Sequence, residues 1–392
     1  MDLACLGDPD AAVGHLAEAR AIAEEVRDLD DLARAYLNLA EILAAPLDRF
    51  EEAIQVARDG VALCAEVGLD ADYGVSLRAI AAGALFEIGR WDEAEALVAE
   101  ASERCPIECA AIDFHLAGAR VALGRGALDA VERHLAAVGE LMTNTRDPQY
   151  TGPLAACTAE LALCRRQPRD ALAAVEAGLD GLEDRWYAAP LVWLGLRAAA
   201  DLGDEEAGER LLARVDDGSS PALAAYAASC AAEATRLRRA ADPEAFAAAA
   251  DAWQRALRPL PAAYCRFREA EALLEHRRRR DAARGLALAF AAADGLRAGP
   301  LLEELELLAR RGRIEVSPAP EPDEPAPSGL TSRELEVLTL VARGLTNRDV
   351  GRELFVTEKT ASAHVSSILT KLSVRSRVEA AATAHRLGLV DT

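Results

Sequence analysis

The stretch Leu345-Thr-Asn-Arg-Asp-Val-Gly-Arg-Glu-Leu-Phe-Val-Thr-Glu-Lys-Thr-Ala-Ser-Ala-His-Val-Ser-Ser-Ile-Leu-Thr-Lys-Leu372 decides how the C-terminal part folds. Thr346 can cap a helix that runs to about Leu354, with Asp349 three residues further on, and Thr357 can cap a second helix that runs to about Leu372. Only an apolar pair, Phe355-Val356, separates them. Because so short a joint forces a steep packing angle, the pattern predicts a helix-turn-helix.

The second predicted helix has two contrasting faces. An apolar stripe recurs at helical spacing: Ala361, Val365, Ile368, Leu369 and Leu372. The opposite face carries short or polar side chains: Lys359, Ser362, Ala363, Ser366, Ser367 and Thr370. A helix that enters the major groove needs such an outer face, because hydroxyls and methyls must reach the base edges. The alternative interpretation is an ordinary amphipathic helix pair.

Both flanks add a helix. Thr331 and Glu334 form a capping box for a helix with Leu335, Leu338, Val341 and Ala342 on one face, which Gly344 ends. Ser376 and Glu379 form a second capping box, and this helix runs to Leu387 before Gly388. The sequence therefore predicts a four-helix domain over residues 330–392.

This domain resembles the LuxR-type DNA-binding domain of bacterial transcription regulators. The resemblance is carried by Leu330-Thr-Ser-Arg-Glu334, Gly344-Leu-Thr-Asn347, Glu358-Lys-Thr360, His364-Val365, Lys371-Leu372 and Arg377-Val-Glu-Ala380. It implies a dimer on double-stranded DNA, with base contacts from Ser362, Ala363 and Ser366. It also implies phosphate contacts from Thr346, Asn347, Lys359, Thr360, Ser367 and Lys371. The dimer contact would come from the last helix, through Ala380, Ala381, Ala384 and Leu387.

The chain departs from the usual pattern of that family at two positions. Ala361 stands in place of a larger Val, and Ser362 in place of a common Lys or Arg. Direct readout at this base step is therefore expected to be weak, with DNA shape and bridging water contributing more.

Residues 1–316 contain a repeating unit. Ala-rich segments alternate with short breaks, and a recurring motif opens the second helix of each pair: Phe50-Glu-Glu-Ala53, Trp91-Asp-Glu-Ala94, Leu128-Asp-Ala130, Arg169-Asp-Ala171, Asp204-Glu-Glu-Ala207 and Arg280-Asp-Ala282. The first five motif alanines are 41, 36, 41 and 36 residues apart. This period predicts an all-α solenoid of tetratricopeptide-like repeats that binds an effector or a protein partner.

The solenoid resembles the repeat region of the large ATP-binding LuxR regulators of the maltose-activator type, most closely over residues 247–313. These regulators begin with an ATPase domain, whereas no Gly-Lys dipeptide occurs in this chain, which excludes a Walker phosphate loop. No cofactor is predicted. Residues 317–329 hold five prolines within ten residues, so they form an extended linker between the two parts.

Charge is divided unevenly between these parts. Residues 329–392 carry nine Lys and Arg against seven Asp and Glu, a net charge of +2. Because the whole chain has a net charge of −21, residues 1–328 must carry −23. The only two lysines of the chain are Lys359 and Lys371. Since an acidic body repels phosphate, nucleic-acid contact is expected from the C-terminal domain alone. Without a leader or an apolar span, the protein is expected to be cytoplasmic and nucleoid-associated when bound to DNA, with no membrane partner.

Other candidate sites are weaker. Cys105, Cys109 and His115 could ligate a metal, but the eight cysteines fit reduced, buried thiols better, and no metal site is predicted. Trp186, Tyr187 and Trp193 could line a ligand groove, although packing in the repeat core is the more common role of such residues. No grouping of nucleophile and base indicates an enzyme. Two alternatives to a DNA-binding regulator remain: a scaffold whose C-terminal domain is covered or serves only dimerisation, and a small-molecule receptor.

Overall fold

The computed structural model describes residues 9–104, 106, 108–142, 147–215, 220–314, 332–342, 345–347, 349–350, 365, 368–369, 372, 374 and 376–386. The chain divides into two compact units, residues 1–316 and 317–392. Every regular element among the described residues is a helix, which confirms the predicted all-α class. None of these helices is both long enough and apolar enough to cross a bilayer.

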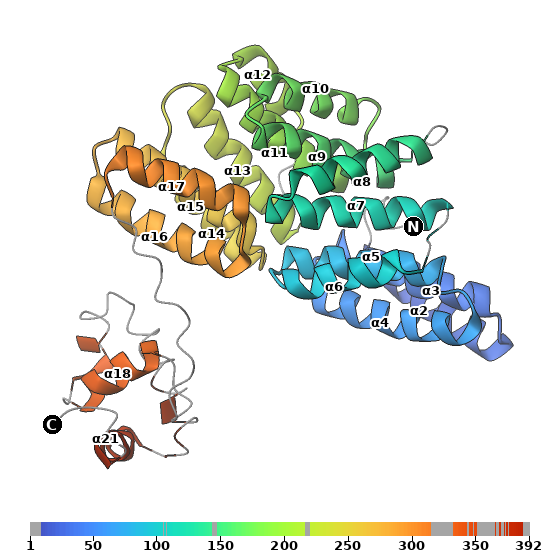
Figure 1. The fold of residues 1–392 in the computed structure, drawn as a ribbon, viewed down its shortest axis with the longest axis horizontal. Coiled ribbons are helices and arrows are strands. Elements are labelled where there is room, and N and C mark those ends of the chain that lie inside the picture. Colours follow the sequence, from blue (N-terminus) through green and yellow to red (C-terminus); the bar gives the residue numbers. More distant parts are fainter. Residues whose placement is uncertain are drawn as a thin grey trace. The chain divides into compact units, whose positions relative to one another are not determined.

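The first unit is a succession of paired helices (Figure 1). Their bounds are α2 Pro9–Val26, α3 Leu29–Ala44, α4 Phe50–Val67, α5 Tyr73–Glu87, α6 Trp91–Ser102, α7 Glu108–Arg125, α8 Leu128–Leu141, α9 Pro148–Cys164, α10 Pro168–Leu179, α11 Arg185–Leu202, α12 Glu205–Leu212, α13 Pro221–Leu237, α14 Pro243–Arg255, α15 Pro259–Glu275, α16 Arg279–Leu296 and α17 Gly299–Gly312. Consecutive helices pack on each other, and α3, α5, α7, α9, α11 and α13 also form a continuous row.

Local sequence explains where the helices begin. Aspartates cap several of them, as where the Asp204 carboxylate accepts the Ala207 amide at 3.0 Å. Proline occupies the first turn of α9, α10, α13, α14 and α15, where no backbone donor is needed.

The recurring motif lies where the sequence predicted it. It opens α4, α6, α8, α10, α12 and α16. Five of the six motif alanines are at most 1% exposed: Ala53, Ala94, Ala171, Ala207 and Ala282. Ala130 was assigned wrongly, because it is half-buried while the neighbouring Val131 is fully buried. α8 begins at Leu128, so its fourth residue, the equivalent of Ala53 in α4, is Val131.

The row of helices curves until its distant members meet. Arg258, after α14, donates to the Asp48 carboxylate before α4 at 2.6 Å, and Asp48 also accepts the Ala222 amide at 3.2 Å. Gly89 has φ +86°, and a Cβ there would lie 2.8 Å from Pro259 and 2.9 Å from Leu296. The turn after α5 therefore packs directly on α15 and α16, and glycine satisfies both the backbone angle and the close approach.

Among the described residues of the second unit, helices α18 Ser332–Ala342 and α21 Arg377–Arg386 pack on each other. The predicted linker, residues 317–329, lies outside the described residues.

Candidate functional site in the C-terminal domain and the repeat cavity

The second unit has its own apolar core. Val337, Leu338 and Val341 of α18 meet Ala380 and Ala384 of α21, together with Val350 and Ile368. Ile368 is 2% exposed, and Val365, Leu369 and Leu372 pack against the core in part. These residues are four of the five in the apolar stripe predicted from helical spacing. The inner face of that segment is confirmed, while Ala361 lies outside the described residues.

The predicted cap at Thr346 is also confirmed. The Asp349 amide donates to the Thr346 hydroxyl at 3.3 Å, and the Asp349 carboxylate accepts the Thr346 amide at 3.2 Å and its hydroxyl at 2.5 Å. This reciprocal arrangement satisfies backbone groups that a helix start leaves open. Both donors of Thr346 are thus engaged by a carboxylate that would repel a phosphate.

The last helix is fixed to the turn that precedes the motif. Ser376 accepts the Glu379 amide at 3.2 Å, as the second predicted capping box requires. The Arg377 guanidinium donates to the Leu345 carbonyl. Together with the shared core, this hydrogen bond holds the start of the motif against α21.

Two of the residues predicted to contact DNA, Thr346 and Asn347, lie among the described residues. Thr346 is exposed and Asn347 half-buried. The others lie outside the described residues: Lys359, Thr360, Ser362, Ala363, Ser366, Ser367 and Lys371. In α21, Ala380 is 1% and Ala384 0% exposed, so both alanines have packing partners inside their own domain. Ala381 is half-buried, and Leu387 lies outside the described residues.

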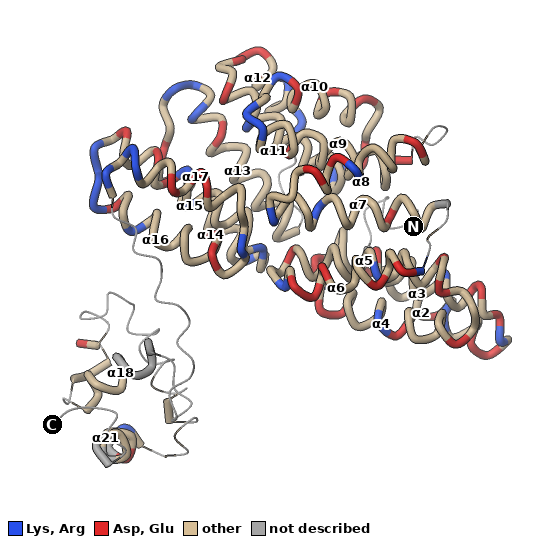
Figure 2. Tube along the Cα trace, in the orientation of Figure 1, with Lys and Arg blue, Asp and Glu red and all other residues tan. Residues whose placement is uncertain are grey.

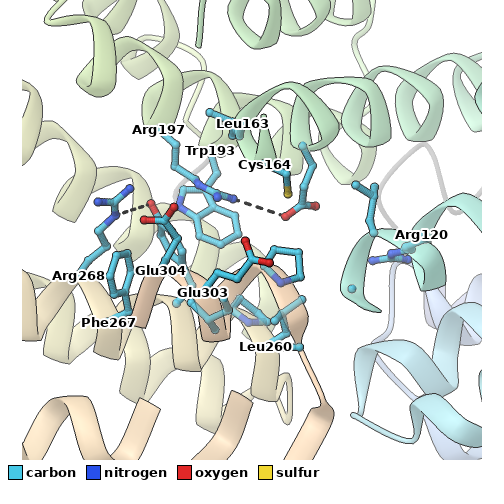
Figure 3. Close-up of a pocket in the computed structure, with 18 of the residues that line it drawn as sticks. Arg120, Leu163, Cys164, Trp193, Arg197, Leu260, Phe267, Arg268, Glu303 and Glu304 are labelled. Atoms are coloured by element: carbon cyan, nitrogen blue, oxygen red, sulfur yellow. Dashed lines mark hydrogen bonds and ion pairs between the residues drawn. The ribbon is translucent and has the colours of Figure 1, made fainter. Parts of the chain in front are cut away.

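The first unit contains a partly open cavity of about 530 Å³. Arg197 and Trp193 extend into it from α11 and Cys164 from α9, while Glu303 and Glu304 extend from α17 on the facing side (Figure 3). The Arg197 guanidinium lies 4.2 Å from the centroid of the Tyr264 ring and 3.7 Å from the Glu160 carboxylate. Charged and aromatic side chains therefore alternate around a space large enough for a small organic ligand.

Three buried donors in this wall have no hydrogen-bond partner among the described residues. They are the indole Nε1 of Trp193 and the Nε atoms of Arg197 and Arg258. Trp193 and Arg258 are each 8% exposed. Because a buried, unpaired donor costs roughly 1–3 kcal/mol, an acceptor that reached them would recover stability. Ligand oxygen atoms are suitable acceptors.

A second cavity of about 340 Å³ adjoins the first, since Arg120, Trp193 and Arg258 line both. Trp186 and Tyr187 line this second cavity. All three aromatic residues proposed from the sequence therefore face cavity space, although Trp193 also packs in the core against Trp253 and Tyr264.

Four carboxyl groups line the second cavity, from Glu41, Glu87, Asp113 and Glu160. Two of them, Glu41 of α3 and Asp113 of α7, have a raised pKa. Burial, then the Asp113 charge, raises the pKa of Glu41 to about 7, against a weaker opposing hydrogen bond from Tyr187. Burial, followed by the Asp72 charge, raises the pKa of Asp113 to about 6, although the Ser76 hydroxyl donates to it at 2.5 Å. Both groups are therefore costly to ionise.

Glu41→Gln is expected to stabilise the first unit at pH 8 by about 1–2 kcal/mol. Because folding raises the pKa of Glu41 above its ordinary 4.5, the folded state binds more protons, and wild-type stability falls as pH rises from about 4.5 to 7. The gain should vanish near pH 4. Urea unfolding at both pH values measures it, with the exposed Glu24→Gln as the control. A gain of equal size at both pH values would contradict this linkage.

One polar pair in the repeats was not predicted from the sequence. His115 and His134 lie with their Nδ1 atoms 2.9 Å apart, and burial lowers the pKa of both rings. Spacing along one helix could not predict this pair, because the two rings come from α7 and α8.

The cysteines were considered above as thiols or metal ligands. Cys64, Cys157, Cys230 and Cys265 are free and buried, as expected for reduced thiols, whereas Cys109 is exposed. No group of three or more metal-ligating side chains occurs within the described part of the chain, and Cys105 lies outside it.

Comparison with known proteins concerns a short part of the chain. Residues 328–384 match the family of bacterial regulatory proteins described as the luxR family. The chain is 53% identical over 62 residues to the transcriptional regulatory protein LiaR of Bacillus subtilis, covering 16% of this chain and 29% of LiaR. It is 44% identical over 62 residues to the oxygen regulatory protein NreC of Staphylococcus haemolyticus, covering 16% and 29%.

A third relative is the nitrate/nitrite response regulator protein NarL of Escherichia coli K12, 46% identical over 57 residues, which cover 14% of this chain and 26% of NarL. The chain thus spans less than a third of the length of these relatives. The family match, the confirmed caps and the confirmed inner stripe agree on the same residues. Residues 328–384 form a LuxR-type helix-turn-helix domain and belong to the LuxR family of bacterial regulatory domains.

Proposed function

We propose that the protein is a transcription regulator that binds double-stranded DNA through residues 330–392. The observation that carries this proposal is the LuxR-family match over residues 328–384, together with relatives that are named transcriptional regulators. In such a protein the cytoplasmic nucleoid is the place of action. No catalytic role is proposed.

Within the domain, we assign base contacts to Ser362, Ala363 and Ser366. Ile368 is buried in the core, and helical spacing puts these three positions on the side opposite Ile368. We assign the main phosphate contacts to Lys359 and Lys371, with Thr360, Asn347 and Ser367 beside them. Thr346 ranks below these residues, because its donors already bind the Asp349 carboxylate.

Ser366→Ala is expected to alter base preference without changing the salt dependence of binding. Loss of one hydroxyl hydrogen bond removes about 1 kcal/mol, or about fivefold discrimination at one base step. Selection from a random DNA pool, with Ser362→Ala in parallel, measures the preference. Thr370→Ala is the matched control, since the sequence places it on the same face but outside the assigned contacts. Unchanged preference in both test variants would refute their assigned role.

We further propose that two copies bind together, with α21 at the contact. Ala380 and Ala384 already fill the core of their own domain, so their part in a dimer would be to fix the position of α21. Ala381 and Leu387 are the predicted residues left to touch the partner. Sedimentation of the full-length protein with and without Leu387→Arg tests this, and an unchanged mass distribution on DNA would exclude Leu387, one residue after the end of α21, from the contact.

For the repeats, we propose that the two adjoining cavities bind a small effector. The buried donors Trp193 Nε1 and Arg258 Nε, which have no partner among the described residues, and the raised pKa values of Glu41 and Asp113 support a ligand site here. The scaffold alternative, with a covered C-terminal domain, rests on the −23 charge of residues 1–328. DNA affinity that rises steeply when salt weakens contact between the two parts would favour that alternative.

A further inference from the structure

The acidic first unit carries one strongly basic surface. Arg277 and Arg278 lie in the turn between α15 and α16, Arg279 and Arg280 open α16, and Arg284 follows about one helical turn later. α17 ends with Arg310 and Arg311, followed by Arg313. All eight arginines are exposed. We call this set the α15–α17 arginine surface.

A hydrogen bond brings its two segments together. The Arg279 guanidinium donates to the Arg313 carbonyl, although 34 residues separate them in sequence. Figure 2 shows basic residues gathered where the α15–α16 turn meets the end of α17, while acidic residues are spread over the other helices of this unit. The eight charges therefore form one surface.

Acidic neighbours balance only part of this charge. Arg278 pairs with Glu244 at 2.8 Å and Asp281 at 3.1 Å, Arg310 with Glu306 at 3.0 Å, and Arg311 with Glu271 at 3.5 Å. No ion pair within the described residues involves Arg277, Arg280 or Arg284. Residues 271–284 and 306–313 contain eight Arg against four Asp and Glu, a balance of +4. Residues 1–328 carry a net charge of −23, but this surface is locally positive and attracts polyanions.

The linker attaches the DNA-binding domain to this same end of the repeats. Seventeen residues, 315–331, separate the last described residue of the first unit from α18. At about 3.5 Å per extended residue they reach at most about 60 Å, which corresponds to about 17 base pairs of duplex at 3.4 Å each. A tether of this length allows DNA held by residues 330–392 to extend to the arginine surface.

We propose that the α15–α17 arginine surface binds the phosphate backbone of DNA that flanks the site held by the C-terminal domain. This inference rests on the proposed DNA-binding function. Exposed guanidinium groups suit the purpose, because each can donate two parallel hydrogen bonds to a phosphate. The contact carries no base preference, since it reads only the backbone. Binding through the arginine surface would also spare the acidic helices of the repeats from contact with the phosphates.

The test compares two duplexes that contain the same selected site, one of 20 base pairs and one extended by 20 base pairs on each side. Anisotropy with the full-length protein gives affinity across salt. We expect tighter binding to the long duplex and a steeper salt slope, by about 0.9 for each engaged phosphate. The triple variant R277Q/R280Q/R284Q should lose about 2–3 of that slope on the long duplex and nothing on the short one.

Three controls separate the outcomes. R58Q/R210Q/R238Q removes the same charge from exposed arginines elsewhere and should behave like wild type. R277K/R280K/R284K should retain the slope if charge is what matters. Absence of site-specific binding to both duplexes would overturn the proposed function itself. Specific binding without a gain from the flanks, or equal losses in the two glutamine triples, would overturn only the arginine surface and would favour an acidic protein as its partner.

Discussion

Glu233→Ala is expected to lower the free energy of unfolding of the first unit by about 3–5 kcal/mol. Glu233 is fully buried on α13, where it accepts the Tyr264 hydroxyl at 2.7 Å and Arg236 Nε at 2.7 Å. Burial alone would raise the pKa of Glu233, but Arg236 and Arg268 outweigh burial and lower it. Removing the carboxylate leaves the guanidinium of Arg236 with only one of its two carboxylate partners, Asp201.

Urea unfolding followed by circular dichroism measures the loss, and pH gives an independent check. Because folding lowers the pKa of Glu233, its contribution is present above about pH 4.5 and is lost as pH falls further. The variant should therefore differ most from wild type at neutral pH. Glu209→Gln, which breaks the exposed pair with Arg238, is the control and should cost less than about 1 kcal/mol. A loss below 1 kcal/mol for Glu233→Ala would mean that Asp201, 2.5 Å from Arg236, is a sufficient partner.

Lys359→Ala with Lys371→Ala is expected to weaken binding to every DNA sequence by about 10- to 30-fold near physiological salt. These are the only lysines in a chain of net charge −21, and the sequence places both on the predicted recognition helix. Each lost phosphate contact should lower the salt slope by about 0.9. Base preference should stay as in wild type, because a lysine ammonium group that contacts a DNA phosphate does not distinguish one base from another.

Anisotropy across salt on two unrelated sites measures both the slope and its independence of sequence. The double variant Lys359→Arg with Lys371→Arg keeps the charge and should retain most of the affinity. An unchanged slope in the alanine variant would show that neither lysine lies at a phosphate, and the assumed orientation of the helix in the groove would be wrong.

The sequence predicted the local features of the fold well. Capping at Thr346 and Ser376 depends on residues three positions apart, and the inner stripe ending in Ile368 and Leu372 depends on one helical period. The buried alanines of the motif were predicted from their regular spacing along the chain. The prediction was wrong at Ala130 because the repeats were aligned on their alanines rather than on the first residue of each helix. Ala130 is the third residue of α8, whereas Ala53 is the fourth residue of α4, so Val131 occupies the buried fourth position of α8.

The cavities and the arginine surface could not be predicted in the same way. Asp48 and Arg258 meet although 210 residues separate them, and Arg279 meets Arg313 from another helix. Such pairings depend on a small rotation between neighbouring repeats, summed over many units. Average charge was also misleading, since a body of −23 still gathers eight exposed arginines at one end.

The contact of Gly89 with Pro259 and Leu296 has a consequence for how the first unit unfolds. An open array of repeats behaves as a one-dimensional chain in which each unit is stabilised only by its neighbours, so its ends can unravel separately. Here the turn after α5 rests on α15 and α16, and Asp48 joins Arg258 across the same junction. Loss of a repeat near either side of this junction removes support from the other, which couples early and late repeats into a single cooperative unit.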